Sequence, residues 1–145
     1  MTRQLDAPAD IGRLPKAEID GEWRAFWEGT ARGELLIQRC PACGRRQFYP
    51  RALCVACGAE PEMVPACGRG TLYTYSIIRQ NLVPPFADMV PYALAMVDLE
   101  EGVRMMTNVI GCTIEDLKIG MPLRVEMRQA DEGYWIPYWR PASDG

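Results

Sequence analysis

The spacing of apolar residues divides the chain into a short helical part and a longer part with the alternation typical of strands. Ile19, Trp23, Phe26 and Trp27 recur at the spacing of one helix face. They predict a helix over residues 17–30, which glycines at positions 29 and 33 end. Residues 1–15 show no clear period, and we expect them to form a loose N-terminal arm.

The rest of the chain favours strands. A short strand is predicted at Gly33–Cys40, before a cysteine-rich stretch. Beyond that stretch, runs rich in β-branched and aromatic residues predict strands at Thr71–Arg79, Tyr92–Leu99, Val103–Ile110, Leu123–Arg128 and Tyr134–Trp139. The fourth run alternates most cleanly, with Leu123, Val125 and Met127 predicted to face inward. Pro137 is expected to confine the fifth run to a sheet edge.

One helical turn is predicted between the third and fourth of these five strands. Thr113 and Asp116 have the spacing of a helix-starting capping box, and Gly120 with Pro122 ends the turn. Five short strands interrupted by one such turn are typical of a small barrel of the OB type. We therefore predict a mainly β protein with one N-terminal helix, divided into residues 1–33, 34–62 and 63–145 as arm with helix, cysteine-rich unit, and barrel with C-terminal tail.

Four of the six cysteines form two matched C-x-x-C pairs, Cys40 with Cys43 and Cys54 with Cys57, separated by ten residues. A glycine follows each pair and permits the left-handed backbone that closes a tight turn. Two such turns facing each other present four thiolates in a tetrahedral array, which is the closed arrangement of a structural zinc site. The sequence therefore predicts one bound metal ion that holds the fold and performs no chemistry.

Zinc is the predicted metal, although single-iron sites use the same turn geometry and spacing alone does not separate the two. Because all four ligands come from the protein, no position stays open for a catalytic water. The two remaining cysteines, Cys67 and Cys112, are expected to be small buried or half-buried apolar residues.

Composition narrows the function further. The 145-residue chain carries a formal charge of −3 and no run long and apolar enough for a membrane span, so we expect a cytoplasmic protein. Histidine is absent, which excludes Ser-His-Asp and Cys-His catalysis and any histidine metal ligand. The near-neutral balance also argues against a general nucleic-acid binder.

Three surfaces are candidates for contacts with other molecules. The first is the set of arginines beside the cysteines, which either meet an anion such as the CoA phosphates or offset the charge of a metal–thiolate centre: Arg45, Arg46 and Arg51. The second is the aromatic stripe of the helix, which either packs internally or meets a partner: Trp23, Phe26 and Trp27. The third is the apolar loop Leu82–Tyr92, which either caps the barrel or is covered by a partner through Pro84, Pro85 and Phe86.

Several segments in their order along the chain resemble a known family. They are "FWEGTARGELLIQRCPACG" (Phe26–Gly44), "FYPRALCVACG" (Phe48–Gly58), "GRGTLYTYSII" (Gly68–Ile78), "PPFADMVPYALAMVDLEEGVRMMTNVIGC" (Pro84–Cys112) and "EDLKIGMPLRVEM" (Glu115–Met127). This series resembles a family of zinc-ribbon plus OB-fold proteins that accompany thiolases and other acyl-CoA enzymes and was long catalogued as a domain of unknown function. The resemblance covers about residues 20–141.

The resemblance implies a rubredoxin-like zinc ribbon followed by an OB barrel, with one structural zinc per chain. It also implies a non-catalytic subunit that forms a hetero-oligomer with a thiolase-type enzyme acting on a CoA thioester. Some relatives are fused to hydratase domains, so a subunit of an acyl-CoA hydratase or lyase complex is an alternative. A third hypothesis is a module for single-stranded nucleic acid, in which bases would stack on Tyr73, Tyr75, Tyr92 and Tyr134.

Overall fold

The computed structural model describes residues 4–8, 11–14, 20–131 and 133–142. Within them lie one α-helix, α1 (Trp23–Ala31), and three 3₁₀ turns, η1 (Ile11–Arg13), η2 (Phe86–Asp88) and η3 (Ile114–Asp116). The strands of the N-terminal half are β1 (Gln4–Leu5), β2 (Leu36–Arg39), β3 (Arg46–Gln47) and β4 (Glu62–Pro65). Those of the C-terminal half are β5 (Arg69–Ile78), β6 (Tyr92–Leu99), β7 (Arg104–Val109), β8 (Cys112–Thr113), β9 (Pro122–Asp131) and β10 (Tyr134–Pro141).

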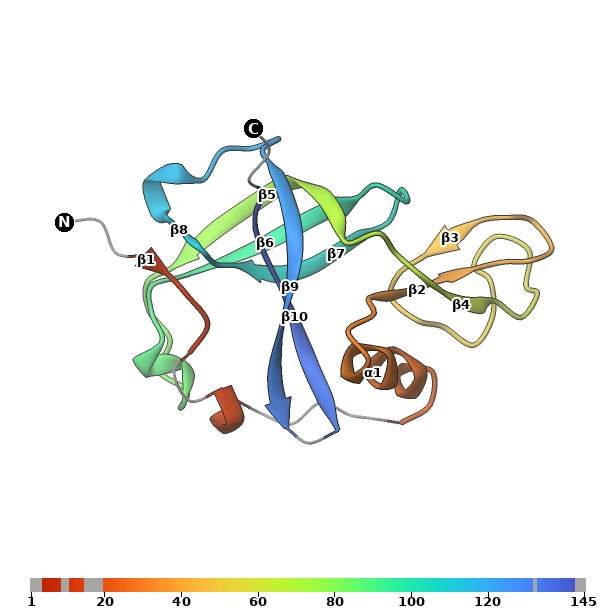
Figure 1. The fold of residues 1–145 in the computed structure, drawn as a ribbon, viewed down its shortest axis with the longest axis horizontal. Coiled ribbons are helices and arrows are strands. Elements are labelled where there is room, and N and C mark those ends of the chain that lie inside the picture. Colours follow the sequence, from red (N-terminus) through yellow and green to blue (C-terminus); the bar gives the residue numbers. More distant parts are fainter. Residues whose placement is uncertain (1–3, 9–10, 15–19, 132, 143–145) are drawn as a thin grey trace.

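Five strands close into a barrel in the order β10-β7-β6-β5-β9 (Figure 1). Neighbouring strands run antiparallel except β7 and β10, which are parallel. This is the strand order of an OB fold, with η3 in the connection between its third and fourth strands. The prediction of a mainly β protein with a five-stranded barrel is confirmed. Thr113 and Asp116 also form the predicted capping box at η3, in which the backbone N–H of Thr113 donates to the Asp116 carboxylate at 3.0 Å.

The barrel and the cysteine-rich unit lie side by side, with α1 beneath both (Figure 1). The cysteine-rich unit is a three-stranded sheet in the order β3-β2-β4. Its last strand, β4, begins at Glu62 and crosses the boundary that the sequence analysis places between residues 62 and 63. No helix in the described part of the chain combines the length and apolar character that a bilayer crossing requires.

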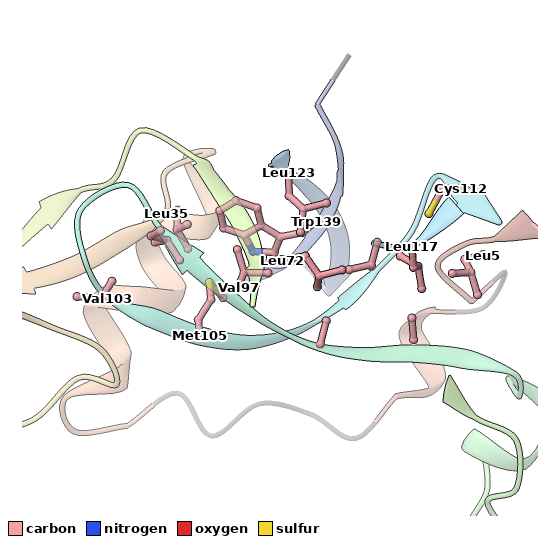
Figure 2. Packing of buried hydrophobic residues seen from close by; sticks show 14 of the residues in the cluster. Leu5, Leu35, Leu72, Val97, Val103, Met105, Cys112, Leu117, Leu123 and Trp139 are labelled. Carbon is pink, nitrogen blue, oxygen red and sulfur yellow. The ribbon is translucent and has the colours of Figure 1, made fainter. Parts of the chain in front are cut away.

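Trp139 occupies the centre of the barrel core. The strand alternation of β6 and β7 sends every second side chain inward, among them Val97 and Met105. Figure 2 shows the Trp139 ring lying among the aliphatic side chains of Leu72, Val97 and Leu123. Trp139 is completely buried, and its indole N–H has no hydrogen-bond partner among the described residues. Its contribution to stability is therefore one of packing.

Helix α1 is tied to the barrel through one threonine. The Thr30 hydroxyl donates to the carbonyl oxygen of Trp27 at 2.7 Å and accepts from the backbone N–H of Trp135 on β10 at 3.0 Å. Toward the other unit, Gly29 allows close approach, because an added Cβ would lie 2.6 Å from the Leu36 side chain. The helix begins at Trp23, and residues 20–22 before it are not helical. Residues 17–19 of the predicted range lie outside the described residues.

Two expectations for the chain ends were wrong. The N-terminal arm was expected to be loose, yet β1 pairs with β8 and Leu5 is buried in the core. A two-residue strand is too short to leave a period in the sequence. Pro137 was expected to confine the last strand to an edge, yet β10 closes the barrel. It does so because the register of β10 with β7 is a single residue pair, Trp139 with Val109, so Pro137 interrupts no ladder on that side.

Candidate metal centre and neighbouring surfaces

The two cysteine pairs form two tight turns of the same design. In each, the backbone N–H of the first cysteine donates to a carbonyl five residues on, and the following glycine donates back to the first cysteine's carbonyl. Gly44 and Gly58 both have φ of 79°, a left-handed conformation that favours glycine. The backbone therefore holds both turns in matching shape and directs their sulfurs to one point.

The four sulfur atoms of Cys40, Cys43, Cys54 and Cys57 all lie within 4.8 Å of one another. The Sγ atoms of Cys40 and Cys57 are 3.5 Å apart, and those of Cys43 and Cys54 are 3.7 Å apart. A tetrahedral zinc ion with bonds of about 2.3 Å requires sulfur–sulfur separations of about 3.8 Å. The donor set and its dimensions thus fit zinc held by four thiolates, and ligation by these residues stays a prediction.

Backbone N–H groups favour the thiolate form of two of the four cysteines, Cys54 and Cys40. The N–H of Ala56 lies 3.4 Å from the Cys54 sulfur and lowers the pKa of that thiol to about 6. The N–H of Cys43, 3.5 Å from the Cys40 sulfur, lowers the pKa of Cys40 as well. Because only the thiolate binds zinc, these donors prepare the site for the metal.

Two buried glutamines brace the loop between the cysteine pairs. The side chain of Gln38 on β2 accepts a hydrogen bond from the backbone N–H of Arg51 and donates one to the Arg51 carbonyl, both at 2.8 Å. Gln47 on β3 donates to the Gln38 side chain at 2.8 Å and accepts from the N–H of Val55 at 3.0 Å. The loop carries few strand hydrogen bonds of its own, so these amides fix its path. These glutamines could not be predicted, because a buried glutamine pair has no sequence pattern.

The three arginines of the candidate anion surface are all exposed. Arg45 and Arg46 follow the first cysteine pair, and Arg51 lies in the loop that the glutamines hold. None of the three side chains has an ion-pair partner among the described residues. Their guanidinium groups are therefore available for an anion.

The aromatic stripe of α1 lies against both units. Phe26 is buried, and its ring centroid lies 5.5 Å from that of Phe48 in the cysteine-rich unit. Trp27 reaches the barrel, with its ring centroid 5.2 Å from that of Tyr134. Trp23 is half-buried beside Phe48. The stripe thus packs within the chain and also lines a cavity of about 400 Å³.

The apolar loop contributes both to this cavity and to the exposed surface. Phe86 lines the cavity together with the helix aromatics, whereas Pro84 and Pro85 do not. The loop start is solvent-exposed, with 81% of Leu82 and 61% of Val83 accessible. The structure therefore brings Phe86 together with the helix stripe and leaves a separate apolar patch on the outer surface.

The two lone cysteines have different environments. Cys112 is buried in the core as expected, and burial raises the pKa of its thiol. Cys67 is exposed, contrary to expectation. Desolvation and the Glu100 carboxylate, 3.4 Å from the sulfur, raise the pKa of Cys67. Neither thiol is activated toward the thiolate, so neither has the character of a nucleophile.

The four tyrosines considered for base stacking form no shared platform. The Arg104 guanidinium lies 3.4 Å from the centroid of the Tyr73 ring and covers it. Tyr134 is buried against Trp27, and the hydroxyl groups of Tyr75 and Tyr92 bond to Leu117 and Asn81 within the chain. This arrangement offers no continuous aromatic surface to a nucleic-acid strand.

Fold and site together define a zinc-ribbon protein with an attached OB-fold barrel. Residues 27–72 match the model of the ChsH2 rubredoxin-like zinc ribbon domain, and residues 63–128 match the ChsH2 C-terminal OB-fold domain. The chain belongs to this family of ChsH2 (DUF35) zinc-ribbon and OB-fold proteins.

Its relatives carry names from several acyl-CoA reactions. The chain is 37% identical to a probable enoyl-CoA hydratase alpha subunit of Thermomonospora curvata, over 88% of this chain but only 40% of that protein. It is 30% identical to the benzoylsuccinyl-CoA thiolase subunit BbsA of Thauera aromatica, over 82% of this chain and 78% of that one. Among solved structures it resembles a chain of the Ltp2-ChsH2(DUF35) aldolase, with 32% identity, a TM-score of 0.79, and coverage of 87% and 98%.

Proposed function

We propose that this protein is a zinc-containing, non-catalytic subunit of an acyl-CoA-metabolising enzyme. The observation that carries the proposal is the closed four-cysteine centre, set in a ribbon beside an OB barrel that offers no activated nucleophile among its described residues. In such a centre the zinc cross-links the two turns, and the four cysteines satisfy its coordination. The chain as a whole contains no histidine, which limits the acid–base chemistry it can perform.

The partner that we favour is a thiolase-type enzyme that forms or cleaves a CoA thioester by (de)condensation. The named thiolase subunit of Thauera aromatica supports this choice, with 30% identity over 82% of this chain. A hydratase or lyase partner is the second candidate, supported by the hydratase and aldolase names among the relatives.

The partner contact is proposed to include the apolar patch at the start of the Leu82–Tyr92 loop, continuing through Pro84 and Pro85 to Phe86. Leu82 and Val83 are large, strongly exposed apolar side chains next to each other. Contiguous apolar surface of this kind on a small protein commonly marks an interaction site. Trp23, Phe26 and Trp27 support the same region from within. Trp23 and Phe26 pack against Phe48, Trp27 packs against both of them, and all three line the cavity that Phe86 also lines.

The experiment that tests the proposal is reconstitution. Each chain is purified alone, assayed for cleavage of an acyl-CoA, and then mixed with the other. We expect a stable hetero-oligomer that is active only when both chains are present, because this chain completes the partner's assembly. A partner that is fully active alone, or thiolytic activity of this chain alone, would contradict the proposal.

A second prediction concerns the exposed arginines of the ribbon. We propose that Arg45, Arg46 and Arg51 contact the phosphates of CoA in the complex. A charge-assisted contact is worth about 1.5–3 kcal/mol, so each productive arginine replaced by alanine should weaken CoA binding by about tenfold or more. Titration calorimetry of the complex with CoA measures this change.

Two controls accompany the arginine variants. Zinc content should stay at the wild-type level, because none of the three side chains is a ligand of the centre. Arg79, another exposed arginine, lies at the end of β5 outside the ribbon, and its replacement by alanine should leave CoA affinity unchanged. Wild-type CoA affinity in the triple variant would show that these arginines face solvent or balance the charge of the metal centre.

A further inference from the structure

The cavity of about 400 Å³ lies on the outside of the barrel, between α1, the ribbon residues Phe48 and Tyr49, and the strands β7 and β10. Its volume lies within the range of about 300–1,000 Å³ that is typical of small-molecule sites. Voids inside protein cores are far smaller, so the cavity is no packing defect. None of the described residues that line it carries a charge.

The cavity lies where the barrel wall is thinnest. Strands β7 and β10 share one residue pair, Trp139 with Val109. Away from this pair, the Thr107 hydroxyl bridges the strands by donating to the Pro137 carbonyl at 2.9 Å. Met106 and Asn108 on β7 and Ile136 on β10 line the space outside this seam. Aromatic rings from α1 and the ribbon complete its apolar lining.

Two polar side chains of β7 and β10 line this apolar space without a hydrogen-bond partner among the described residues. Neither the hydroxyl of Tyr138 nor the side-chain amide of Asn108 has a hydrogen-bond partner among the described residues. Tyr138 is only 5% exposed, and its burial raises its pKa to about 12, so the hydroxyl stays protonated and can donate. Both polar groups are therefore free to hydrogen-bond to a molecule that enters the cavity.

We infer that the cavity binds the uncharged, largely apolar acyl group of a CoA thioester, with Tyr138 and Asn108 hydrogen-bonded to a polar atom of that group. The acyl assignment rests on the proposed function, whereas the binding of an apolar group does not. The sequence order supports a ligand with one apolar and one charged end. Phe48 and Tyr49, which line the cavity, lie between Arg46 and Arg51, whose guanidinium groups are available to phosphates.

The test uses the zinc-loaded full chain without any partner. Its probes are 2-naphthol, 2-naphthoyl-CoA and CoA, followed by titration calorimetry and tryptophan fluorescence. We expect saturable one-to-one binding of 2-naphthol with quenching of the fluorescence, because Trp23 and Trp27 line the cavity. The naphthoyl thioester should bind at least about tenfold more tightly than CoA, since only it carries an apolar end that fills the cavity.

Three variants locate the binding. Met106→Trp, at a half-exposed position on the outer face of β7, should fill the cavity and weaken 2-naphthol binding by more than about tenfold. Tyr138→Phe removes one oxygen and should weaken binding by about three- to tenfold, as expected for a lost hydrogen bond. Tyr73→Phe is the matched control, because Tyr73 lies outside the cavity, and it should change nothing.

The outcomes separate this inference from the proposed function. Absence of saturable 2-naphthol binding, or equal binding to all variants, overturns the inference even if reconstitution succeeds. Should the partner enzyme alone quench the tryptophans where the probes do not, a partner side chain fills the cavity and the inference is wrong. If 2-naphthol binds as expected but the naphthoyl thioester binds no more tightly than CoA, the acyl assignment is overturned. If Met106→Trp fails to fold, Tyr138→Phe and its control Tyr73→Phe still test whether 2-naphthol binds in the cavity.

Discussion

Replacement of Cys54 and Cys57 by serine is expected to remove the metal and unfold the ribbon. The wild-type chain should contain one zinc ion, and the double variant almost none, because two thiolates leave half of the coordination sphere empty. Structural zinc contributes about 10–16 kcal/mol in zinc-finger peptides. The small ribbon sheet, with a β3 strand of two residues, has little else of that size to hold it.

Elemental analysis of the purified chains measures the zinc content, and limited proteolysis measures the unfolding. Cleavage should begin in the loop between the two cysteine pairs, because a metal ion no longer joins the two ends of this loop. Cys67→Ser is the matched control, because this cysteine lies outside the four-sulfur centre and should leave zinc and protease resistance unchanged. Full zinc content in the double variant would show that the ligands are wrongly assigned.

Trp139→Ala is expected to lower the free energy of unfolding by about 3–5 kcal/mol, as is typical of a large aromatic residue truncated in a core. The side chain is completely buried at the centre of the barrel core, so its removal leaves a cavity there. A loss of this size is a large share of the stability of an ordinary domain. Urea denaturation of the zinc-loaded chain provides the measurement.

Trp139→Phe distinguishes packing from hydrogen bonding at the same position. Phenylalanine keeps most of the volume and removes an indole N–H that has no partner among the described residues. The free energy of unfolding should therefore fall clearly less in Trp139→Phe than in Trp139→Ala. Equal losses for the two variants, or a loss below about 1 kcal/mol for alanine, would contradict the packing role.

The barrel was predictable because its information is local. Alternating side chains along β6 and β9 reveal which face is buried, and Thr113 with Asp116 marks the turn of η3. The pairing of β1 with β8 was not predictable, because it joins two-residue strands more than a hundred positions apart. The prediction for Pro137 was wrong for a related reason. Whether a proline confines a strand to a sheet edge depends on which neighbouring strand forms no ladder at that point.

The candidate site was predictable in part. The two C-x-x-C pairs indicate a shared metal site, and the four sulfurs lie together accordingly. The cavity left no comparable signal, because its walls come from α1, the ribbon loop, the loop at Phe86 and the strands β6, β7 and β10. The helix stripe was recognised as either packing or contact surface, and it lines the cavity while packing against Phe48. Only the folded structure shows that the same aromatic side chains pack within the chain and also line the cavity.

The thin closure between β7 and β10 also has a consequence for motion. The ladders β5–β6, β6–β7 and β9–β10 are long and must break before their strands separate, and β5 shares three residue pairs with β9. Between β7 and β10, one residue pair and the Thr107 bridge hold the wall. Local opening is least costly where few backbone hydrogen bonds are lost. Breathing of the barrel is therefore concentrated along this line, while the β9 ladder keeps β10 in register. The seam can widen around a guest molecule and close again without unfolding of the rest of the barrel.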